Sequence, residues 1–340
     1  MSTPKLPKFG SVLAKQMAIA WFRDDAWESF SIQELQPLPL HPASHVLQFG
    51  SCLFEGFKTY RHPDDSLYIF RLSRHVERMR NSAKMLSLPV PDADFLIDMV
   101  FAAVNANREE VPRAPKALYV RPVLIGTSPM IAASAFPSSD ACLYILTSPV
   151  GDLFAGGARP LKIAVDGVHP RATPQIAAAK AGANYAAGLG PILAGKRDHG
   201  VDQVLFAPGG EVHESGGSGF VLLRDDAIRV KEFDGSFLPS VTRDSIVIMA
   251  PDLGYQVVEH RFTIDEMLEW TQEGEAALCG TAAVLSGIGL LVHEGKEYRV
   301  GTGEIGSNTL RLRKALTDIQ NGLAPDEYRW LTKVPLPHSK

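Results

Sequence analysis

Short apolar runs alternate with amphipathic helical patterns through the first half of the chain. Runs rich in Val, Ile, Leu and aromatic residues predict strands at Met17–Phe22, Cys52–Arg61, Leu67–Phe70, Leu118–Ile125 and Cys142–Thr147. Apolar side chains at steps of three and four predict a helix over Ser73–Leu88. A second helix is predicted over Phe95–Ala106, with Asp92 or Asp94 as its cap.

The second half continues the alternation. Strands are predicted at Leu161–Val165, Gln203–Phe206, Phe220–Leu223, Gln256–His260 and Ala276–Cys279. Helices are predicted up to Leu193 and at Arg243–Met249, Ile264–Trp270 and Thr309–Gln320. Pro208, Gly209 and Gly210 predict a tight turn. Alternating strands and helices indicate the α/β (α+β) class.

One stretch, Ser148–Pro160, separates the two patterned halves. It is dominated by Gly, Pro and Ala and has no helical period, which is typical of a linker. A chain of 340 residues is also long for a single hydrophobic core. We therefore expect a smaller N-terminal α/β domain at 1–150, an interdomain linker at 151–160 and a larger C-terminal domain at 161–340.

Composition narrows the classes of protein that fit. Hydrophobic residues make up 45% and charged residues 21%, which is ordinary for a globular protein. A net charge of −4 argues against nucleic acid or an anionic membrane as partner. The uncharged segment Ala276–Val292 is interrupted by three glycines, so we do not expect it to span a membrane.

The cysteines and histidines bear on compartment and metal binding. Cys52, Cys142 and Cys279 are widely separated and form no C-x-x-C pair, which favours a reducing compartment. The N-terminus lacks the apolar region of a secretory signal. We therefore expect a cytoplasmic protein. The histidines show no metal-ligand spacing, so no metal is predicted.

Candidate chemistry begins with Lys180, in the segment AAAKAGANYAAG. Its neighbours have almost no side chain, so a bulky group could approach the backbone from either side. A desolvated lysine can lose its proton and form a Schiff base with an aldehyde. The alternative is an ordinary lysine whose charge reaches solvent from an Ala-rich helix.

Two segments have the character of anion-binding sites. Ser240 or Thr242 stands just before an apolar helical run, where unpaired backbone amides and a hydroxyl can bind phosphate. At CGTAAV, a predicted strand ends in Gly280 and Thr281, again with amides and a hydroxyl. Each is also compatible with an ordinary cap or turn. Neither matches a Walker loop or a dinucleotide fingerprint, so a nucleotide is not predicted.

Arg121 lies inside the apolar strand ALYVRPVLIG. A charge in such a strand is costly unless it is paired or faces a polar cleft. We therefore expect either an internal ion pair or capture of a substrate carboxylate, which suits the planar guanidinium. In SCLFEGFKTY, Phe54 and Glu55 stand beside Gly56, either at a site or as part of an ordinary strand.

Together these residues resemble a known family. The motifs that carry the resemblance are SCLFEGFKTY, HVERMRNSAK, LYVRP, AAKAGANY, HESGG, LPSVTRDSI and CGTAA, in that order from about Ile19 to Gln320. The set resembles the class IV (fold type IV) pyridoxal-phosphate (PLP) enzymes, and within them the branched-chain amino acid aminotransferases. The resemblance implies two α/β domains with the cofactor at their interface. It also implies a homodimer in which the partner contributes to each site.

The resemblance also implies roles for individual residues. Lys180 would bind the cofactor covalently and shuttle a proton between Cα and the cofactor C4′. Glu214 would keep the pyridine nitrogen protonated, which makes the ring an electron sink, and Tyr185 would hydrogen-bond its phenolic oxygen. The phosphate would be held by Arg78, the Val241 and Thr242 amides and Thr281. The substrate would be lined by Phe54, Tyr119, Arg121 and the Thr281–Ala282 amides.

Three positions depart from the family pattern. Gly219 stands where relatives usually have Asn, and Phe49 and Leu153 stand where related enzymes carry tyrosine. The two lost hydroxyls leave Arg121 to meet the side-chain carboxylate of glutamate. We therefore expect hydrophobic L-amino acids to be good substrates, and glutamate and 2-oxoglutarate to bind weakly.

The resemblance predicts a PLP-dependent transaminase that moves the amino group of hydrophobic or branched-chain L-amino acids to a 2-oxo acid. Its alternatives are a D-amino acid aminotransferase, an aminodeoxychorismate lyase or a non-catalytic PLP-binding protein. The strand LYVRP favours the branched-chain type. Retention of both Lys180 and Glu214 argues against a protein that only binds the cofactor.

Overall fold

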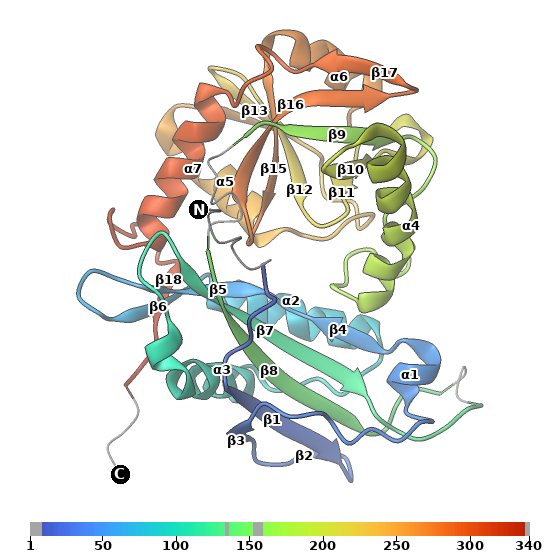
Figure 1. The fold of residues 1–340 in the computed structure, drawn as a ribbon, viewed down its shortest axis with the longest axis vertical. Helices are drawn as coiled ribbons and strands as arrows, with labels where there is room; N and C mark the ends of the chain where they lie inside the picture. The colour runs from blue at the N-terminus through green and yellow to red at the C-terminus, as the bar shows by residue number, and fades with distance from the viewer. Residues whose placement is uncertain (1–8, 133–135, 152–158, 337–340) are drawn as a thin grey trace, which may run out of the picture. The chain divides into compact units, whose positions relative to one another are not determined.

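The structure is a computed structural model that describes residues 9–132, 136–151 and 159–336. The chain forms two compact units (Figure 1). The first unit comprises Met1–Ala155, Ala179–Ala183 and Ile319–Lys340, and the second comprises Gly156–Ala178 and Asn184–Asp318. The first unit thus includes two segments, 179–183 and 319–340, that fall within the C-terminal domain predicted from the sequence. Most of the predicted linker lies outside the described residues.

The first unit is built on one antiparallel sheet. Its strands are β1 (Gln16–Arg23), β2 (Ala26–Trp27), β3 (Ser31–Glu34), β4 (Cys52–Phe54), β5 (Phe57–Arg61), β6 (Leu67–Phe70), β7 (Ala117–Gly126), β8 (Ala141–Val150) and β18 (Leu331–Lys333). Its helices are α1 (His45–Phe49), α2 (Leu72–Met85), α3 (Ala93–Ala106) and the single turn η1 (Arg108–Glu110). The sheet runs β18-β6-β5-β7-β8-β1-β2, with β3 on β1 and β4 on β7.

A break divides the strand that the sequence predicts over Cys52–Arg61. β4 and β5 both pair with β7 in one continuous antiparallel register, Phe54 with Val123 and Phe57 with Val120. Pro122 falls opposite the break, and its nitrogen has no hydrogen to donate to the ladder. Only the bond from the Glu55 amide to the Pro122 carbonyl remains, at 2.9 Å. The single-strand prediction is therefore wrong at Glu55 and Gly56.

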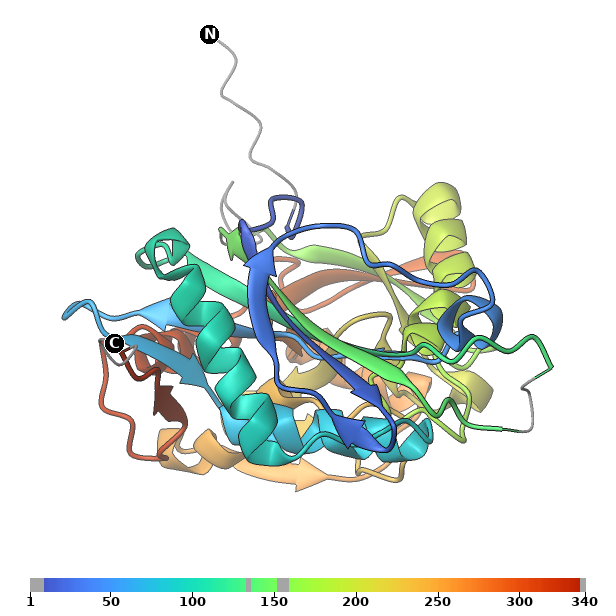
Figure 2. The same ribbon diagram turned by 90° about the horizontal axis from the view of Figure 1, so that it is seen from below.

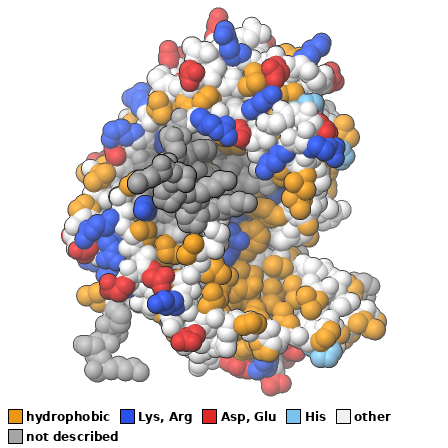
Figure 3. Space-filling view, in the orientation of Figure 1, with side chains coloured by type: hydrophobic (Ala, Val, Ile, Leu, Met, Phe, Trp, Pro, Cys, Tyr) orange, Lys and Arg blue, Asp and Glu red, His pale blue; other side chains and the backbone are white. Residues whose placement is uncertain are grey.

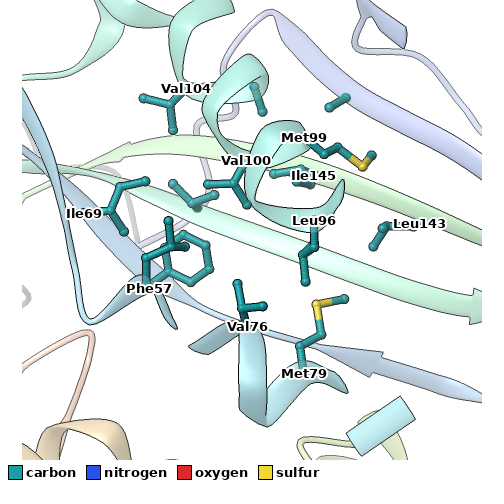
Figure 4. Packing of buried hydrophobic residues seen from close by; sticks show 14 of the residues in the cluster. Phe57, Ile69, Val76, Met79, Leu96, Met99, Val100, Val104, Leu143 and Ile145 are labelled. Atoms are coloured by element: carbon teal, nitrogen blue, oxygen red, sulfur yellow. The ribbon is translucent and has the colours of Figure 1, made fainter. Parts of the chain in front are cut away.

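Helices α2 and α3 cover one face of this sheet. Figure 4 shows Val76 and Met79 of α2 and Leu96 and Met99 of α3 packed against strand residues such as Phe57. α3 lies along β1 and β8, as Figure 2 shows from below. Because side chains alternate along a strand, the other face of β7 carries Tyr119 and Arg121.

The second unit is built on another mixed sheet. Its strands are β9 (Leu161–Asp166), β10 (Gln203–Phe206), β11 (Glu214–Ser215), β12 (Gly219–Leu223), β13 (Ala227–Val230), β14 (Gln256–Glu259), β15 (Glu275–Gly280), β16 (Val284–His293) and β17 (Lys296–Arg299). Its helices are α4 (Gly182–His199), α5 (Val241–Met249), α6 (Ile264–Glu273), α7 (Ser307–Gln320) and the turns η2 (Pro208–Gly210) and η3 (Pro251–Leu253). The sheet runs β11-β10-β9-β16-β15-β12-β13-β14, with β17 on β16.

The uncharged segment Ala276–Val292 forms most of the hairpin β15–β16, with Gly280 paired to Val284 across the turn. Burial between neighbouring strands explains why it carries no charge. Within the described ranges, no helix is long and apolar enough to cross a membrane. On the face shown in Figure 3, positive and negative side chains are interspersed over the surface.

Most of the predicted elements are confirmed, and most of the errors fall at element ends and on short elements. α2 ends at Met85, three residues before the predicted end, and α4 continues six residues past Leu193. Asp92 is the N-cap residue of α3, although its side chain makes no capping hydrogen bond. No prediction covers the short elements β2, β3, β11, β13, β17, β18 and α1, or the long strand β16.

Gly289 tests the packing at the bulge in β16. A Cβ there would overlap the Gly303 carbonyl oxygen and lie 2.6 Å from the Pro160 Cβ. We expect Gly289→Ala to lower the free energy of unfolding by about 1–3 kcal/mol, since backbone must move. Urea unfolding of wild type and variant measures this change in the free energy of unfolding. Gly190→Ala on α4, with no atom within 4 Å of the added Cβ, is the control and should be neutral or stabilising. Equal stability of the two variants would contradict the packing argument.

Candidate active site

Lys180 is held by its backbone at the edge of the first unit's sheet. It precedes α4 instead of lying on it, so the alternative of a lysine on the Ala-rich helix is wrong. Its carbonyl accepts a hydrogen bond from the Phe54 amide at 3.1 Å, and Ala181 bridges to Leu53. Its amide donates to Ser82 Oγ on α2 at 3.0 Å. The lysine is thus fixed between β4 and α2.

The ring of Phe54 lies close to two cations. Lys180 Nζ is 5.1 Å from the ring centroid, and the Arg121 guanidinium carbon is 4.4 Å from it. Cations at this distance are attracted by the ring's π electrons. Phe54 therefore groups the predicted Schiff-base lysine with the predicted carboxylate-binding arginine.

Arg121 is arranged to receive an anion. Its Nη2 donates to Tyr119 Oη at 2.8 Å, while its buried Nε has no hydrogen-bond partner among the described residues. Arg121 also forms no ion pair with any described carboxylate, so the expected internal ion pair is not observed. An orphaned buried donor costs about 1–3 kcal/mol, and a carboxylate ligand would remove that cost.

Gly56 makes room for this arrangement. A Cβ at Gly56 would overlap Tyr119 Oη and lie 2.7 Å from the ring carbon that bears it. The residue at the break between β4 and β5 must therefore lack a side chain, because the Tyr119 ring occupies the space that a Cβ would need. This close approach explains the glycine of the F-E-G motif.

Arg78, the predicted phosphate ligand, lies in a buried cluster with Glu55 and His75. Arg78 Nε and Nη2 donate to the two Glu55 carboxylate oxygens at 2.6 and 2.9 Å. His75 Nδ1 lies 2.9 Å from Glu55 Oε2. All three residues are at least nine-tenths buried. Ser82 Oγ donates to the Arg78 carbonyl, so one hydroxyl connects the arginine's helical turn with Lys180.

Charge within the cluster is set by two opposing effects. Burial alone raises the pKa of Glu55, but Arg78 and His75 outweigh it and hold that pKa well below its usual range. Burial lowers the pKa of His75 despite the adjacent carboxylate. The cluster at neutral pH is therefore a carboxylate, a guanidinium and a neutral imidazole. The sequence does not indicate that Glu55 pairs with Arg78, since the two residues are 23 positions apart.

In the second unit, Glu214 and Tyr185 lie around a residue that the sequence analysis missed. Glu214 is 4% exposed, and its Oε1 accepts hydrogen bonds from Arg171 Nε at 2.5 Å and the Leu238 amide at 3.0 Å. The Arg171 guanidinium carbon is also 5.6 Å from the centroid of the Tyr185 ring. No sequence pattern marks Arg171, which stands 43 residues before Glu214.

The predicted anion-binding helix is α5, and Ser240 is its N-cap. Ser240 Oγ accepts from the Arg243 amide at 3.2 Å. The amides of Val241 and Thr242 belong to the first turn, so no helix carbonyl accepts from them. A Cβ at Gly219 would lie 3.1 Å from Cys279 Sγ and 3.5 Å from Ser240 Cβ. Gly219 therefore allows β12 to pack closely against β15 and the cap of α5.

Thr281 and Ala282 form the turn between β15 and β16. The strands pair up to Gly280 and Val284, so the turn contains three residues. Its three residues, Thr281, Ala282 and Ala283, are partly exposed.

The structure thus gathers the predicted residues into two sets, each within one unit. The first-unit set contains Phe54, Arg78, Tyr119, Arg121 and Lys180, and the second-unit set contains Tyr185, Glu214, Val241, Thr242, Thr281 and Ala282. Of the other departures, Phe49 ends α1 with its ring 4.9 Å from that of His45, and Leu153 lies outside the described residues. Among the described side chains, no group of three or more His, Cys, Asp or Glu residues is placed to hold a metal.

A groove of about 1120 Å³ in the second unit involves neither set. It is lined by residues that include Asp166, His169, His199, Glu211, Arg261 and His293.

Comparison with known proteins identifies the family of this chain. A model of the family "Amino-transferase class IV" matches residues 52–289. The "Probable branched-chain-amino-acid aminotransferase" of Streptomyces coelicolor is 34% identical over 335 residues, covering 96% of this chain and 92% of the relative. The chain therefore belongs to the class IV aminotransferase family, and within it to the branched-chain-amino-acid aminotransferases.

Solved structures of this family share the fold. A branched-chain amino acid aminotransferase from T.th. with pyridoxamine 5′-phosphate has a TM-score of 0.81 and 25% identity, covering 96% of this chain and all of that one. The same enzyme complexed with N-(5′-phosphopyridoxyl)-L-glutamate has a TM-score of 0.79, 25% identity and the same coverage. The predicted fold type IV class is confirmed.

Glu55 provides a test of the buried cluster. Glu55→Gln should lower the free energy of unfolding by about 3–5 kcal/mol, since Arg78 loses its partner in a buried site. Because the pKa of Glu55 is lowered in the folded state, its stabilisation is complete above the ordinary carboxyl pKa. It is lost as pH falls toward the folded pKa. The difference between wild type and variant should therefore shrink below about pH 5.

Urea unfolding across pH measures this difference. Glu77→Gln on α2, the helix of Arg78, removes an exposed pair with Arg74 and should change stability by less than about 1 kcal/mol. A pH-independent difference between wild type and Glu55→Gln would contradict the assignment of the charge.

Proposed function

We propose that this protein is a PLP-dependent aminotransferase that moves the amino group of branched-chain and other hydrophobic L-amino acids to a 2-oxo acid, with 2-oxoglutarate as the family's usual acceptor. The observation that carries the proposal is Lys180, whose backbone is fixed beside Phe54 and α2. A lysine held this way presents its amine at a defined point. The T.th. relative, solved with pyridoxamine 5′-phosphate, supports the choice of cofactor.

The residues present fit this cofactor. The amides of Val241 and Thr242, with Thr281, suit a phosphate group, and Arg78 adds a positive charge. Bound PLP withdraws electrons from the substrate Cα and so makes its C–H bond acidic. Lys180 would hold the cofactor through its amine and would then move the proton at Cα. Glu214 would hold the proton on the pyridine nitrogen, and Tyr185 would hydrogen-bond the phenolic oxygen.

The substrate side is assigned to the other members of the two sets. Phe54 and Tyr119 supply apolar walls, and the Arg121 guanidinium carbon lies 4.4 and 5.2 Å from the centroids of their rings. A positive charge bounded by two aromatic faces can accept an aliphatic side chain along the rings or a carboxylate at the guanidinium. The amides of Thr281 and Ala282 suit the α-carboxylate. An enzyme with both amino acid and 2-oxo acid substrates needs this dual character.

We also propose a homodimer, by family resemblance and from an exposed apolar surface in the first unit. Leu47, Ile131 and Phe136 are 59%, 75% and 63% exposed. His45 brings their segments together through its amide, bonded to the Ser128 carbonyl, and through Nε2, 3.2 Å from the Phe136 carbonyl. Grouped apolar side chains of this size are typical of protein interfaces. A cytoplasmic location is proposed from the three unpaired cysteines.

Lys180→Ala tests the proposed activity. Loss of the amine should abolish the visible absorption of the lysine-bound cofactor and lower the turnover of leucine with 2-oxoglutarate by orders of magnitude. Borohydride reduction of the wild type followed by peptide mass analysis should locate the cofactor on Lys180. Lys196→Ala, an exposed lysine on α4, is the control. Near-normal turnover by Lys180→Ala would refute the proposal.

Arg121→Leu tests substrate selection. Removal of the guanidinium should lower kcat/KM for glutamate by about 10- to 150-fold, the equivalent of one charge-assisted hydrogen bond of about 1.5–3 kcal/mol. Leucine, which makes no such bond through its side chain, should be little affected. Half-reaction kinetics with the two amino acids measure both values. An equal loss for leucine and glutamate would mean that Arg121 supports the fold and does not select the substrate.

A further inference from the structure

Arg171 is a buried arginine in a connection between secondary-structure elements, where a charged side chain is unusual. It is 4% exposed and lies in the connection between β9 and the lysine segment. Its Nε donates to Glu214 Oε1 at 2.5 Å, and both side chains of the pair are almost fully buried. Burying two charges removes their hydration, and apolar residues of similar size often serve stability equally well. The pair therefore calls for a reason besides stability.

Two hydrogen bonds of Glu214 converge on the same carboxylate oxygen. Oε1 accepts both from Arg171 Nε and from the Leu238 amide at 3.0 Å. Two donors on one oxygen fix the rotation of the carboxylate. The adjacent guanidinium also favours the ionised carboxylate over the acid. Both effects are what a carboxylate needs in order to hold a proton on a neighbouring nitrogen.

Arg171 also contacts the second residue assigned to the cofactor ring. Its guanidinium carbon lies 5.6 Å from the centroid of the Tyr185 ring. In PLP, the pyridine nitrogen and the phenolic oxygen are on the same edge of the ring, with a single carbon atom between the positions that bear them. Groups that hold these two atoms must lie side by side. Arg171 touches both of the groups, Glu214 and Tyr185.

One hydrogen-bond donor of Arg171 is unsatisfied among the described residues. Its Nη2 is buried and lacks a hydrogen-bond partner among the described residues. A residue kept for stability alone would have its donors satisfied, because an orphaned buried donor is costly. The guanidinium is thus committed to Glu214 through Nε, while Nη2 is left without a protein acceptor.

We propose that Arg171 is a positioning residue for the cofactor ring: it holds Glu214 ionised and oriented toward the pyridine nitrogen, and aligns Tyr185 beside it. This inference rests on the proposed function. The main effect of Arg171 is exerted through Glu214, so its loss should weaken ligands that carry a ring nitrogen more than ligands that lack it. A structural role would instead weaken all ring ligands alike.

The test compares two ligands and three variants of the full-length protein after removal of its cofactor. The ligands are PLP and its 1-deaza analogue, in which a C–H group replaces the ring nitrogen. Dissociation constants are measured by absorbance titration for wild type, Arg171→Gln, Arg171→Lys and Arg159→Gln. Arg159 is the control, since it forms an exposed ion pair with Asp202 in the same unit.

Wild type and Arg159→Gln should bind PLP about 10- to 150-fold more tightly than the analogue, the value of one charge-assisted hydrogen bond. In Arg171→Gln this preference should fall toward unity, mainly through weaker binding of PLP. Arg171→Lys keeps the charge but not the planar fork and should give an intermediate preference. If Arg171→Gln does not fold, Arg171→Lys decides the test.

Two results would overturn the inference. A wild-type preference retained in the Arg171 variants, even with lower thermal stability, would mean that Arg171 only supports the fold. Binding of PLP by the wild type without preference over the analogue would mean that Glu214 does not act on the ring nitrogen. A wild-type protein that binds neither ligand would instead overturn the proposed function, and this inference with it.

Discussion

The backbone hydrogen bonds of Lys180 are the constraint on which the rest of the first-unit site depends. Its carbonyl completes the outer edge of β4, through the Phe54 amide, and its amide is bonded to Ser82 on α2. The residues on either side of 179–183 belong to the second unit. A short segment is therefore anchored in one unit while the chain around it builds the other. The position of the lysine backbone then follows from the sheet and the helix that bind it.

The break between β4 and β5 serves the same site. Pro122 interrupts the ladder because it has no N–H. The interruption coincides with Glu55, which is buried against Arg78, and with Gly56, over which Tyr119 lies. A continuous strand here would alternate its side chains regularly between the two faces. The irregular stretch instead places the Glu55 carboxylate, a glycine and the Tyr119 ring next to Phe54, whose amide binds the lysine segment.

Buried arginine–carboxylate pairs recur in both units. Arg78 pairs with Glu55 in the first, and Arg171 with Glu214 in the second. In each pair one member is assigned to the cofactor and the other is not, so each pair couples a binding group to the protein interior. Loss of one partner leaves an uncompensated buried charge. The pairs therefore make the geometry of the two sets sensitive to residues that touch no ligand.

The sequence by itself determined the α/β class, most of the longer strands and helices, and the residue types of the site. Those follow from local patterns: period-two and period-3.6 apolar spacing, the cap Ser240 before α5, and Lys180 among small residues. Only the tertiary structure decided that Glu55 lies against Arg78 and Arg171 against Glu214, and that 179–183 joins the first unit. These are contacts between residues far apart in the chain, formed because burial compels charges to pair. No local pattern records which distant residue supplies the partner.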